Sequence, residues 1–342
     1  MKLGFGLGYS GAHMALPMDD IRRAEALKWE SVWTAESYGS DAMTPLAFIA
    51  GQTTRLKLGT SVAQIPARSA ANLAMCAQTI DDMAGRGRMI VGLGVSGPQV
   101  VEGWYGQPWG KPSALLRDYV AIVKKVWKRQ GPLSHEGSAI SLPYAGQGSS
   151  GLGKPLKSIL HGNPDIPLLL GTSTPGNIRL TAEIADGWIS MTWFPGAMKL
   201  YGALFEEGLA KRTDGLSLSG FDITALVSIS LTNNVREAID RIKPNIALHV
   251  GGMGAQSKNY HKQRMAVAGF PEAADRVQEL FLSGRKDEAV QAVPDDYIDL
   301  TGLIGPADRI VSRWKAWADS GATRAILLRP TPDVIELSKR ML

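Results

Sequence analysis

The sequence is poor in cysteine, since Cys76 is the one cysteine among 342 residues. A chain with a single cysteine cannot form an internal disulfide, so a disulfide-stabilised fold is excluded. Cys76 lies at helical spacing from Leu73, Ile80 and Met83, and this pattern favours a buried apolar role for its thiol over a reactive one.

Long apolar runs are also missing. No segment approaches the roughly 18 to 20 consecutive apolar residues that a membrane-spanning helix needs. The first residues, MKLGFGLGYSGAHM, offer one lysine and then glycine at positions 4, 6 and 8, which makes a poor apolar region for a secretory signal. The sequence therefore predicts a cytoplasmic protein with no membrane association.

Clusters of like charge and of aromatic residues are absent as well. Lys and Arg number 37 against 32 Asp and Glu, no run of one sign is long, and aromatic residues make up 7% of the chain. Nucleic-acid binding is therefore not expected. The net charge of +5 fits either a polyanionic small-molecule ligand or a solvated basic surface, and charge alone favours the second.

Motifs for metal-dependent and nucleophilic hydrolysis are not present. The five histidines are far apart in the sequence and form no ligand pairs. The chain contains neither a G-x-S-x-G elbow nor a phosphate loop of the Walker type. We therefore expect no metal site and no serine hydrolase.

What the sequence does contain is a series of short apolar runs that alternate with helical patterns. Parallel strands need crossover helices, and eight of them can close into a barrel without an exposed edge. The pattern therefore predicts an α/β fold, a (β/α)8 TIM barrel spanning residues 1–342 as a single domain, with a doubly wound open sheet as the alternative. The expected strands are residues 3–8, 31–35, 56–62, 88–94, 166–171, 187–192, 223–230 and 323–329.

Two stretches are longer than a minimal barrel requires and are expected to be insertions, at about 131–165 and about 233–305. Elsewhere the helical signals are clear. Residues 68–84 and 114–129 place apolar side chains on one stripe with a helical period. Near the C-terminus, Pro306 suits a first helical turn, and Gly321 is a plausible stop before the last strand.

The stretch VGLGVSGPQVVEGWYG begins at Val91, and Gly92, Gly94 and Gly97 form a G-x-G-x-x-G pattern. A dinucleotide site requires a helix directly after these glycines. Prolines and glycines are frequent between positions 98 and 112 and disfavour a regular helix there, so a Rossmann site is not expected. At the end of a barrel strand, the glycines would instead admit a flat ligand or form a tight turn.

Residues 58–106, LGTSVAQIPARSAANLAMCAQTIDDMAGRGRMIVGLGVSGPQVVEGWYG, resemble the luciferase-like monooxygenase superfamily, specifically its bacterial oxidoreductases that use the deazaflavin coenzyme F420. The resemblance covers nearly the whole chain, and SGPQVVEGW and EIADGW are its specific pieces. Further matching segments are WESVWTAESYGSDAMTPLAFIAGQT (29–53), LLLGTSTPGNIRLTAEIADGWIS (168–190) and GGMGAQSKNY (251–260).

The resemblance implies a barrel whose C-terminal mouth holds the deazaflavin, with the substrate stacked against the ring. The Ser61–Val62 bond matches the position of a non-proline cis peptide that presses behind the central ring in relatives. Val95, Ser96 and Gly97 would lie along the ring or the ribityl chain.

The resemblance also implies that the cofactor phosphate lies at the turn after the fifth strand. The residue types support this independently, because Ser and Thr cap helices, proline suits a first helical turn, and backbone N–H groups at a helix start bind anions. The turn consists of Ser173, Thr174, Pro175, Gly176 and Asn177.

The chain departs from the sugar-phosphate dehydrogenases of the superfamily, which carry an acidic residue and a histidine after strand two. This chain has Glu36 and Ser37 there, so sugar-phosphate oxidation is not expected. Glu36 and Tyr38 are the catalytic candidates, with an arginine pair for Glu36 and packing for Tyr38 as the alternatives. Candidate walls of the substrate pocket, or else rim packing, are Tyr9, Ser37, Gln64 and Trp193.

The sequence thus predicts hydride transfer between C5 of F420 and a small-molecule or peptide substrate, running as reduction of an activated C=C or C=N bond. An FMN-dependent monooxygenase of the same fold is the first alternative. A barrel that binds deazaflavin without turnover is the second. Members of the family often dimerise through barrel helices, so a homodimer is expected.

Overall fold

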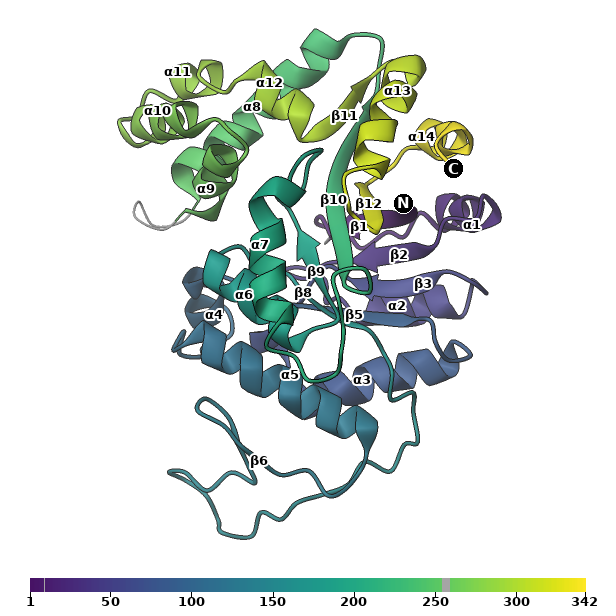
Figure 1. Ribbon diagram of the computed structural model, residues 1–342, viewed down its shortest axis with the longest axis vertical. Helices are drawn as coiled ribbons and strands as arrows, with labels where there is room; N and C mark the ends of the chain where they lie inside the picture. The colour runs from purple at the N-terminus through teal and green to yellow at the C-terminus, as the bar shows by residue number, and fades with distance from the viewer. Residues whose placement is uncertain (9, 254–258) are drawn as a thin grey trace. The chain divides into compact units, whose positions relative to one another are not determined.

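The computed structural model describes residues 1–8, 10–253 and 259–342 of the chain, and Figure 1 shows their helices and strands. These residues form two compact units. The larger unit comprises residues 4–189 and 204–222, and the smaller unit comprises residues 1–3, 190–203 and 223–342. None of the described helices combines the length and the apolarity that crossing a bilayer requires.

Parallel strands form the centre of the larger unit. They are buried from end to end in most cases, as strands covered on both faces are, which is why they read as continuous apolar runs in the sequence. A short strand β4 (Ala63–Gln64) pairs with the outer half of β5. The order is β1 (Lys2–Gly8), β2 (Ser31–Thr34), β3 (Lys57–Thr60), β5 (Met89–Gly94), β8 (Leu168–Leu170) and β9 (Gly187–Ser190).

Helices follow these strands along the chain. The indole of Trp127 donates to the carbonyl of Ala74 at 3.1 Å, which fixes α5 (Pro112–Lys128) against α3 (Ala70–Met83). The helices of the larger unit are α1 (Met18–Ala26), α2 (Thr44–Ala50), α3 (Ala70–Met83), α4 (Pro98–Gly103), α5 (Pro112–Lys128) and α6 (Pro175–Ile184), with a 3-10 turn at Ile65–Ala67.

The stretch expected as the first insertion begins with a small antiparallel hairpin, β6 (His135–Glu136) and β7 (Ser141–Leu142). The carboxylate of Asp118 on α5 holds this hairpin, since it accepts hydrogen bonds from the backbone of Ala139 and Ile140 at 2.7 and 2.9 Å. Residues 143–165 contain no helix or strand, and Figure 1 shows them as a long loop beside α5 and α3.

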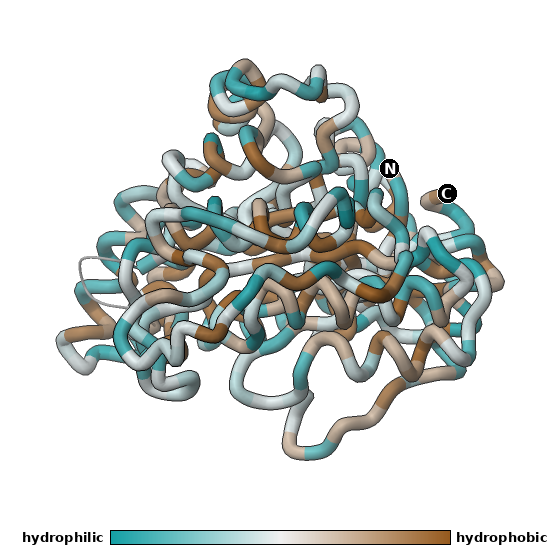
Figure 2. Tube along the Cα trace, turned by 90° about the horizontal axis from the view of Figure 1, so that it is seen from below, coloured by the Kyte–Doolittle hydropathy of each residue, from teal (hydrophilic) through white to brown (hydrophobic). Residues whose placement is uncertain are grey.

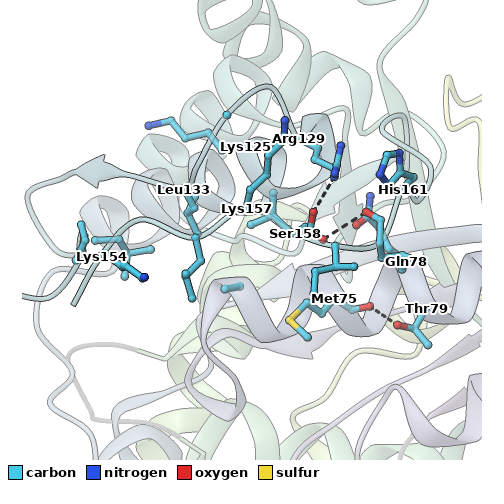
Figure 3. A pocket seen from close by; sticks show the side chains of 18 residues that line it. Met75, Gln78, Thr79, Lys125, Arg129, Leu133, Lys154, Lys157, Ser158 and His161 are labelled. Carbon is cyan, nitrogen blue, oxygen red and sulfur yellow. Dashed lines mark hydrogen bonds between the residues drawn. The ribbon is translucent and has the colours of Figure 1, made fainter. Parts of the chain in front are cut away.

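This loop, α3 and α5 line an apolar pocket of about 850 Å³ that is open to solvent. Figure 3 shows Met75 and Gln78 of α3, Arg129 at the end of α5 and Ser158 of the loop around it, with a hydrogen bond from Arg129 to the carbonyl of Ser158. Several apolar side chains of the loop are exposed, and Ile159 is 92% exposed. The outer face of α3 and α5 therefore carries an apolar surface.

The smaller unit has three parallel strands in the order β11 (Gly302–Gly305), β10 (Asp222–Leu231), β12 (Arg324–Leu328). In its described residues, the stretch expected as the second insertion, 233–305, contains β11 and five of the helices. The helices are α8 (Val235–Gly252), α9 (Tyr260–Val267), α10 (Pro271–Leu282), α11 (Lys286–Gln291), α12 (Asp295–Leu300), α13 (Ala307–Ala318) and α14 (Pro332–Leu337), followed by a 3-10 turn; α7 (Met198–Leu209) has residues in both units.

Apolar side chains fill the interior of each unit. Val32, Leu58 and Leu168 are fully buried in the larger unit, and Val277 and Trp317 are fully buried in the smaller one. Figure 2 colours the chain by hydropathy and shows hydrophobic and hydrophilic stretches alternating along the trace. Full burial of one such aliphatic side chain contributes about 1.5–3 kcal/mol, so these interiors supply most of the stabilisation.

The eight predicted strands are all present, and the helices predicted at 68–84 and 114–129 are α3 and α5. Sequence analysis missed β11 because GLIG is a run of four residues directly after a helix. Pro306 lies at the N-cap of α13, one residue before its expected place, and Gly321 follows the end of that helix with a φ of +90°.

Two expectations are wrong. A helix does follow the G-x-G-x-x-G pattern, because Pro98 occupies its first position, where the missing N–H costs nothing. This helix, α4, spans six residues and ends at Gly103. Cys76 is half-buried rather than buried, and its thiol lies 3.7 Å from the side-chain oxygen of Asn72.

Candidate active site

The peptide bond between Ser61 and Val62, directly after β3, is cis, as the resemblance implies. The side chain of Val62 lies against two glycines of neighbouring strands. A Cβ atom on Gly94 would lie 2.6 Å from Val62 Cγ2, and one on Gly171 would lie 3.0 Å from Val62 Cγ1. Glycine at both positions therefore makes the space that Val62 fills.

The first glycine of the G-x-G-x-x-G pattern also serves packing. A Cβ atom on Gly92 would lie 2.1 Å from the carbonyl oxygen of Thr60, so β3 and β5 approach closely only with glycine there. Gly97 differs, because a Cβ atom on it would approach only the flexible side chain of Gln99, at 3.2 Å. Of the three glycines, only Gly97 leaves its surroundings open to a ligand.

The turn between β5 and α4 consists of Val95, Ser96 and Gly97, all half-buried. Ser96 has a φ of +63°, an uncommon conformation for a residue with a side chain. This conformation redirects the chain between the end of β5 and Pro98. The structure thus brings the three predicted cofactor residues to the carboxyl end of a central strand, where barrel enzymes bind their ligands.

Glu36 follows β2 and is 8% exposed. Its carboxylate accepts hydrogen bonds from Arg68 Nη1 at 2.8 and 3.1 Å and from the backbone N–H of Gln64 at 2.8 Å. The side-chain amide of Gln64 donates in return to the carbonyl of Glu36 at 2.8 Å. The pairing with an arginine, the alternative role for Glu36, is therefore present, and Glu36 holds Gln64 in place.

Arg68 connects Glu36 to a second carboxylate, because its Nη2 donates to Asp41 at 3.1 Å. Burial opposes the positive charge of Arg68, but the hydrogen bond and charge of Glu36 and the charge of Asp41 outweigh it, so the pKa of Arg68 is raised. Tyr119 of α5 donates to the carbonyl of Arg68 at 3.0 Å. Glu36, Arg68 and Asp41 thus form a half-buried ionic cluster in which each charge has a counter-ion.

Sequence reasoning missed Arg68, Asp41 and Tyr105 in this neighbourhood. The hydroxyl of Tyr105 donates to the carbonyl of Ser37 at 3.3 Å, and burial together with the charge of Glu36 raises the pKa of Tyr105. Arg68 lies 32 positions from Glu36, and no pattern in the sequence relates them. The one available signal for Arg68 was a basic residue shortly after a predicted strand.

Two buried polar atoms beside the cis bond have no hydrogen-bond partner within the described residues. They are Ser61 Oγ and Gln64 Oε1. A buried polar group without a partner costs about 1–3 kcal/mol, so such atoms need an explanation. Both follow β3 at its carboxyl end.

The predicted phosphate turn begins helix α6. Thr174 is the N-cap, and its side chain accepts a hydrogen bond from the backbone N–H of Asn177 at 3.3 Å, while Pro175 occupies the first helical position. Ser113 of α5 donates to the side-chain oxygen of Asn177 at 2.6 Å. Ser173 and Gly176 are exposed, so this helix start is accessible from solvent.

The predicted site residues that remain are Tyr38, Trp193 and Tyr9. Tyr38 is 66% exposed, which leaves its phenol accessible. Trp193 is 1% exposed in the smaller unit, donates to Ser320 Oγ at 2.8 Å and stacks on Tyr201. Tyr9 lies outside the described residues. Among the residues the structure describes, no group of three His, Cys, Asp or Glu side chains is placed to hold a metal.

Comparison with known proteins gives the family. The family model described as luciferase-like monooxygenase matches residues 9–324. A relative from Mycobacterium tuberculosis, a candidate coenzyme F420-dependent oxidoreductase, is 42% identical over 96% of this chain and 94% of its own length. The 5,10-methylenetetrahydromethanopterin reductase of Archaeoglobus fulgidus is 26% identical over 91% of this chain and 88% of its own.

Among solved structures, the coenzyme F420-dependent tetrahydromethanopterin reductase from Methanopyrus kandleri superimposes with a TM-score of 0.78. The identity is 22%, and the match covers 100% of this chain and 98% of the reductase. This likeness shows the fold, a closed barrel of eight parallel strands surrounded by helices. The predicted fold class is confirmed, and the doubly wound sheet is excluded.

Proposed function

Since the chain belongs to the luciferase-like monooxygenase family, we propose that it is a coenzyme F420-dependent oxidoreductase that reduces an activated C=C or C=N bond. Two relatives support this proposal. The Mycobacterium tuberculosis relative is named as F420-dependent, and the Archaeoglobus fulgidus relative is named as a reductase. When bound, reduced F420 supplies a hydride from C5 and releases a proton as it becomes oxidised F420, and it reacts as a two-electron carrier.

The observation that carries the proposal is the pair of unpartnered polar atoms after β3. Ser61 Oγ can donate to an acceptor, and Gln64 Oε1 can accept from an N–H or O–H group. A polar heterocycle with both kinds of group on its rim fits this pair. Gln64 is 6% exposed and is held by Glu36 at both its backbone N–H and its side-chain amide, so its carbonyl oxygen is pre-oriented for a ligand.

Two further segments would hold the cofactor. Backbone N–H groups at the start of α6, near Gly176, would bind its phosphate, because helix N-termini stabilise anions. Val95, Ser96 and Gly97 would lie along the ring or the ribityl chain. Thr174 keeps the helix start ordered through its cap, so the N–H groups of that turn are fixed before the anion arrives.

The two catalytic candidates have different tasks in this proposal. Glu36, whose carboxylate is engaged by Arg68 and Gln64, orients the residues that contact the ring. Tyr38 presents an exposed phenol that is able to donate the proton which accompanies hydride addition. Replacing Tyr38 with Phe should therefore lower turnover while F420 binding stays unchanged.

The test is a titration of the purified protein with F420 and, separately, with FMN, followed by assays with the reduced cofactors. We expect F420 to bind, and reduced F420 to be oxidised by a panel of enones, imines and dehydroamino acids without oxygen consumption. Selective binding of FMN with oxygen uptake would identify a monooxygenase. Binding of F420 without oxidation by any of these substrates would identify a carrier protein.

We also propose that the protein is a homodimer. The exposed apolar side chains of the loop at 143–165, beside the cavity between α3 and α5, support a second copy as the occupant of this surface. The loop carries Leu152, Leu156 and Ile159, which are 85%, 68% and 92% exposed. Light scattering should give twice the chain mass, and Ile159→Asp should shift it toward that of one chain.

A further inference from the structure

The smaller unit contains a cavity of about 430 Å³, which none of the predicted site residues lines. Helices α8, α9 and α12 and strands β10 and β11 line it. Its size lies within the range of small-molecule sites, roughly 300–1,000 Å³. Its walls are largely apolar, and they include Ile242, Ile246, Ile298 and Ile304.

Cationic and imidazole side chains face this cavity without carboxylates. Arg241, His249, His261 and Arg264 are among its lining residues, and no Asp or Glu of the described chain lines it. Arg241 also forms an ion pair with Glu237, in which both side chains are more than half exposed. The cavity thus combines an apolar body with an excess of positive charge.

Arg264 is the group that most needs an explanation. Its Nε is buried and has no hydrogen-bond partner among the described residues. A buried guanidinium atom without a partner is costly, because its hydration is lost and nothing replaces it. The hydrogen-bonding fork of arginine fits a carboxylate, whose oxygens can accept from two of its N–H groups at once.

Two histidines of this cavity, His249 and His261, lie close together. Their rings lie 4.7 Å apart, centroid to centroid, in an edge-to-face arrangement. Burial, and then the charges of His249 and Arg264, lower the pKa of His261 to about 4. His261 is therefore neutral near pH 7, and the positive charge of the cavity comes from its arginines.

We propose that this cavity binds an organic anion with an apolar body and a single carboxylate head, which Arg264 holds and Arg241 assists. The isoleucine walls accommodate the body, and the carboxylate supplies the counter-ion that the described lining residues do not give Arg264. The observations that support this class of ligand all come from the smaller unit. That such anions are also the substrates of the enzyme rests on the proposed function.

The test is calorimetric titration of the full chain with trans-cinnamate and with its neutral isostere, cinnamamide. We expect cinnamate to bind at least ten times more tightly than the amide. Arg264→Met should weaken cinnamate at least tenfold and leave the amide within twofold of wild type, and Arg264→Lys should recover part of the loss. Equal affinities for acid and amide, or undetectable binding of cinnamate, would overturn the inference.

Two further variants keep the test decisive. Arg276→Met on α10 removes the same charge from the same unit, where Arg276 pairs with Glu279 outside the cavity, and should leave both affinities unchanged. Arg241→Met changes a side chain that is 74% exposed, so folding is not at risk, and should weaken cinnamate about threefold. Wild-type affinity for cinnamate in both Arg264→Met and Arg241→Met would refute the assignment.

The outcome is separable from that of the proposed function. F420 binding is measured on the same samples by the quenching of its fluorescence. Cinnamate binding without F420 binding supports the anion site and contradicts the proposed function. F420 binding without a preference for cinnamate over cinnamamide supports the function and contradicts the anion site.

Discussion

The ionic groups of the two units are arranged in opposite ways. In the larger unit, Arg68 lies between Glu36 and Asp41, and every charge of the cluster has a partner within 3.1 Å. In the smaller unit, Arg264 faces a cavity with no carboxylate among its described lining residues. Charges that compensate one another fix local geometry, whereas a buried charge without a counter-ion is suited to a ligand that brings one.

This difference separates structural from binding roles for residues of the same type. Arg68 and Arg264 are both half-buried, and sequence alone gives no means to distinguish them. The contacts of Arg68 end on protein carboxylates, and its loss would leave Glu36 uncompensated. The loss of Arg264 would leave no protein carboxylate behind in the cavity.

The largest expected effect is therefore on stability. Arg68→Met should lower the free energy of unfolding by about 3–5 kcal/mol, because it leaves a buried carboxylate without its partner. Arg264→Met should change it by less than about 1 kcal/mol, because no ion pair is broken. Urea denaturation measures both.

An exposed pair provides the control for this contrast. Arg117 on α5 pairs with Glu183 on α6 at 2.7 Å, and the Arg117 side chain is half exposed. Arg117→Met should cost less than about 1 kcal/mol, as exposed pairs do. Equal losses for Arg68→Met and Arg117→Met would show that the cluster around Glu36 is not structurally special.

The second prediction concerns pH and the smaller unit. Because the pKa of His261 is about 4 in the folded protein, against about 6.5 in an unfolded chain, the unfolded state binds its proton first as the pH falls. Stability should be lost between about pH 6.5 and 4, by at most about 3 kcal/mol, with no further loss from this group below pH 4.

His261→Gln should remove that part of the pH dependence. The measurement is urea denaturation of wild type and variant at several pH values between 4 and 7.5. We expect the difference in unfolding free energy between the two proteins to change across this range and to be constant above pH 7. If the unfolding free energies of wild type and His261→Gln differed by the same amount at every pH, this would contradict the burial of a neutral His261 beside His249 and Arg264.

The third prediction concerns the packing of Val62. Gly94→Ala should destabilise the protein by about 1–3 kcal/mol, as overpacking does, and weaken F420 binding, because its Cβ would displace Val62. Gly97→Ala is the matched control for stability alone, since its Cβ would approach only the Gln99 side chain. The double variant Gly94→Ala with Val62→Ala should recover stability, and failure to do so would show that Val62 is not what Gly94 accommodates.

The smallest expected effect is at the start of α6. Thr174→Ala removes the hydroxyl that accepts from Asn177 and should cost about 1 kcal/mol of stability, while Thr174→Ser should retain it. F420 affinity should fall several-fold in Thr174→Ala through the less ordered phosphate turn. A titration that shows unchanged affinity would place the phosphate elsewhere.

Much of the fold was accessible from sequence because each signal was local. Strands buried on both faces, such as Leu168–Leu170, are continuous apolar runs, and Thr174 and Pro175 form a recognisable helix start. The position of the cis bond came from the resemblance rather than from any pattern in residues 58–62. Both kinds of information lie within a few neighbouring residues.

The rest depends on contacts between distant positions. Arg68 meets Glu36 across 32 positions and Asp41 across 27, and neither spacing follows from helix or strand geometry. The G-x-G-x-x-G pattern was ambiguous for the same reason, since only the structure shows that Gly92 and Gly94 contact Thr60 and Val62. The cavity around Arg264 was invisible because three helices and two strands contribute to it.

The most direct test of the central claim is a crystal structure of the protein with bound F420. The account predicts the deazaflavin ring against Val62, with polar atoms of the cofactor within hydrogen-bond distance of Ser61 Oγ and Gln64 Oε1, and the phosphate at the N-terminus of α6. Clear density for F420 at a place that leaves both of those atoms without a partner would contradict it.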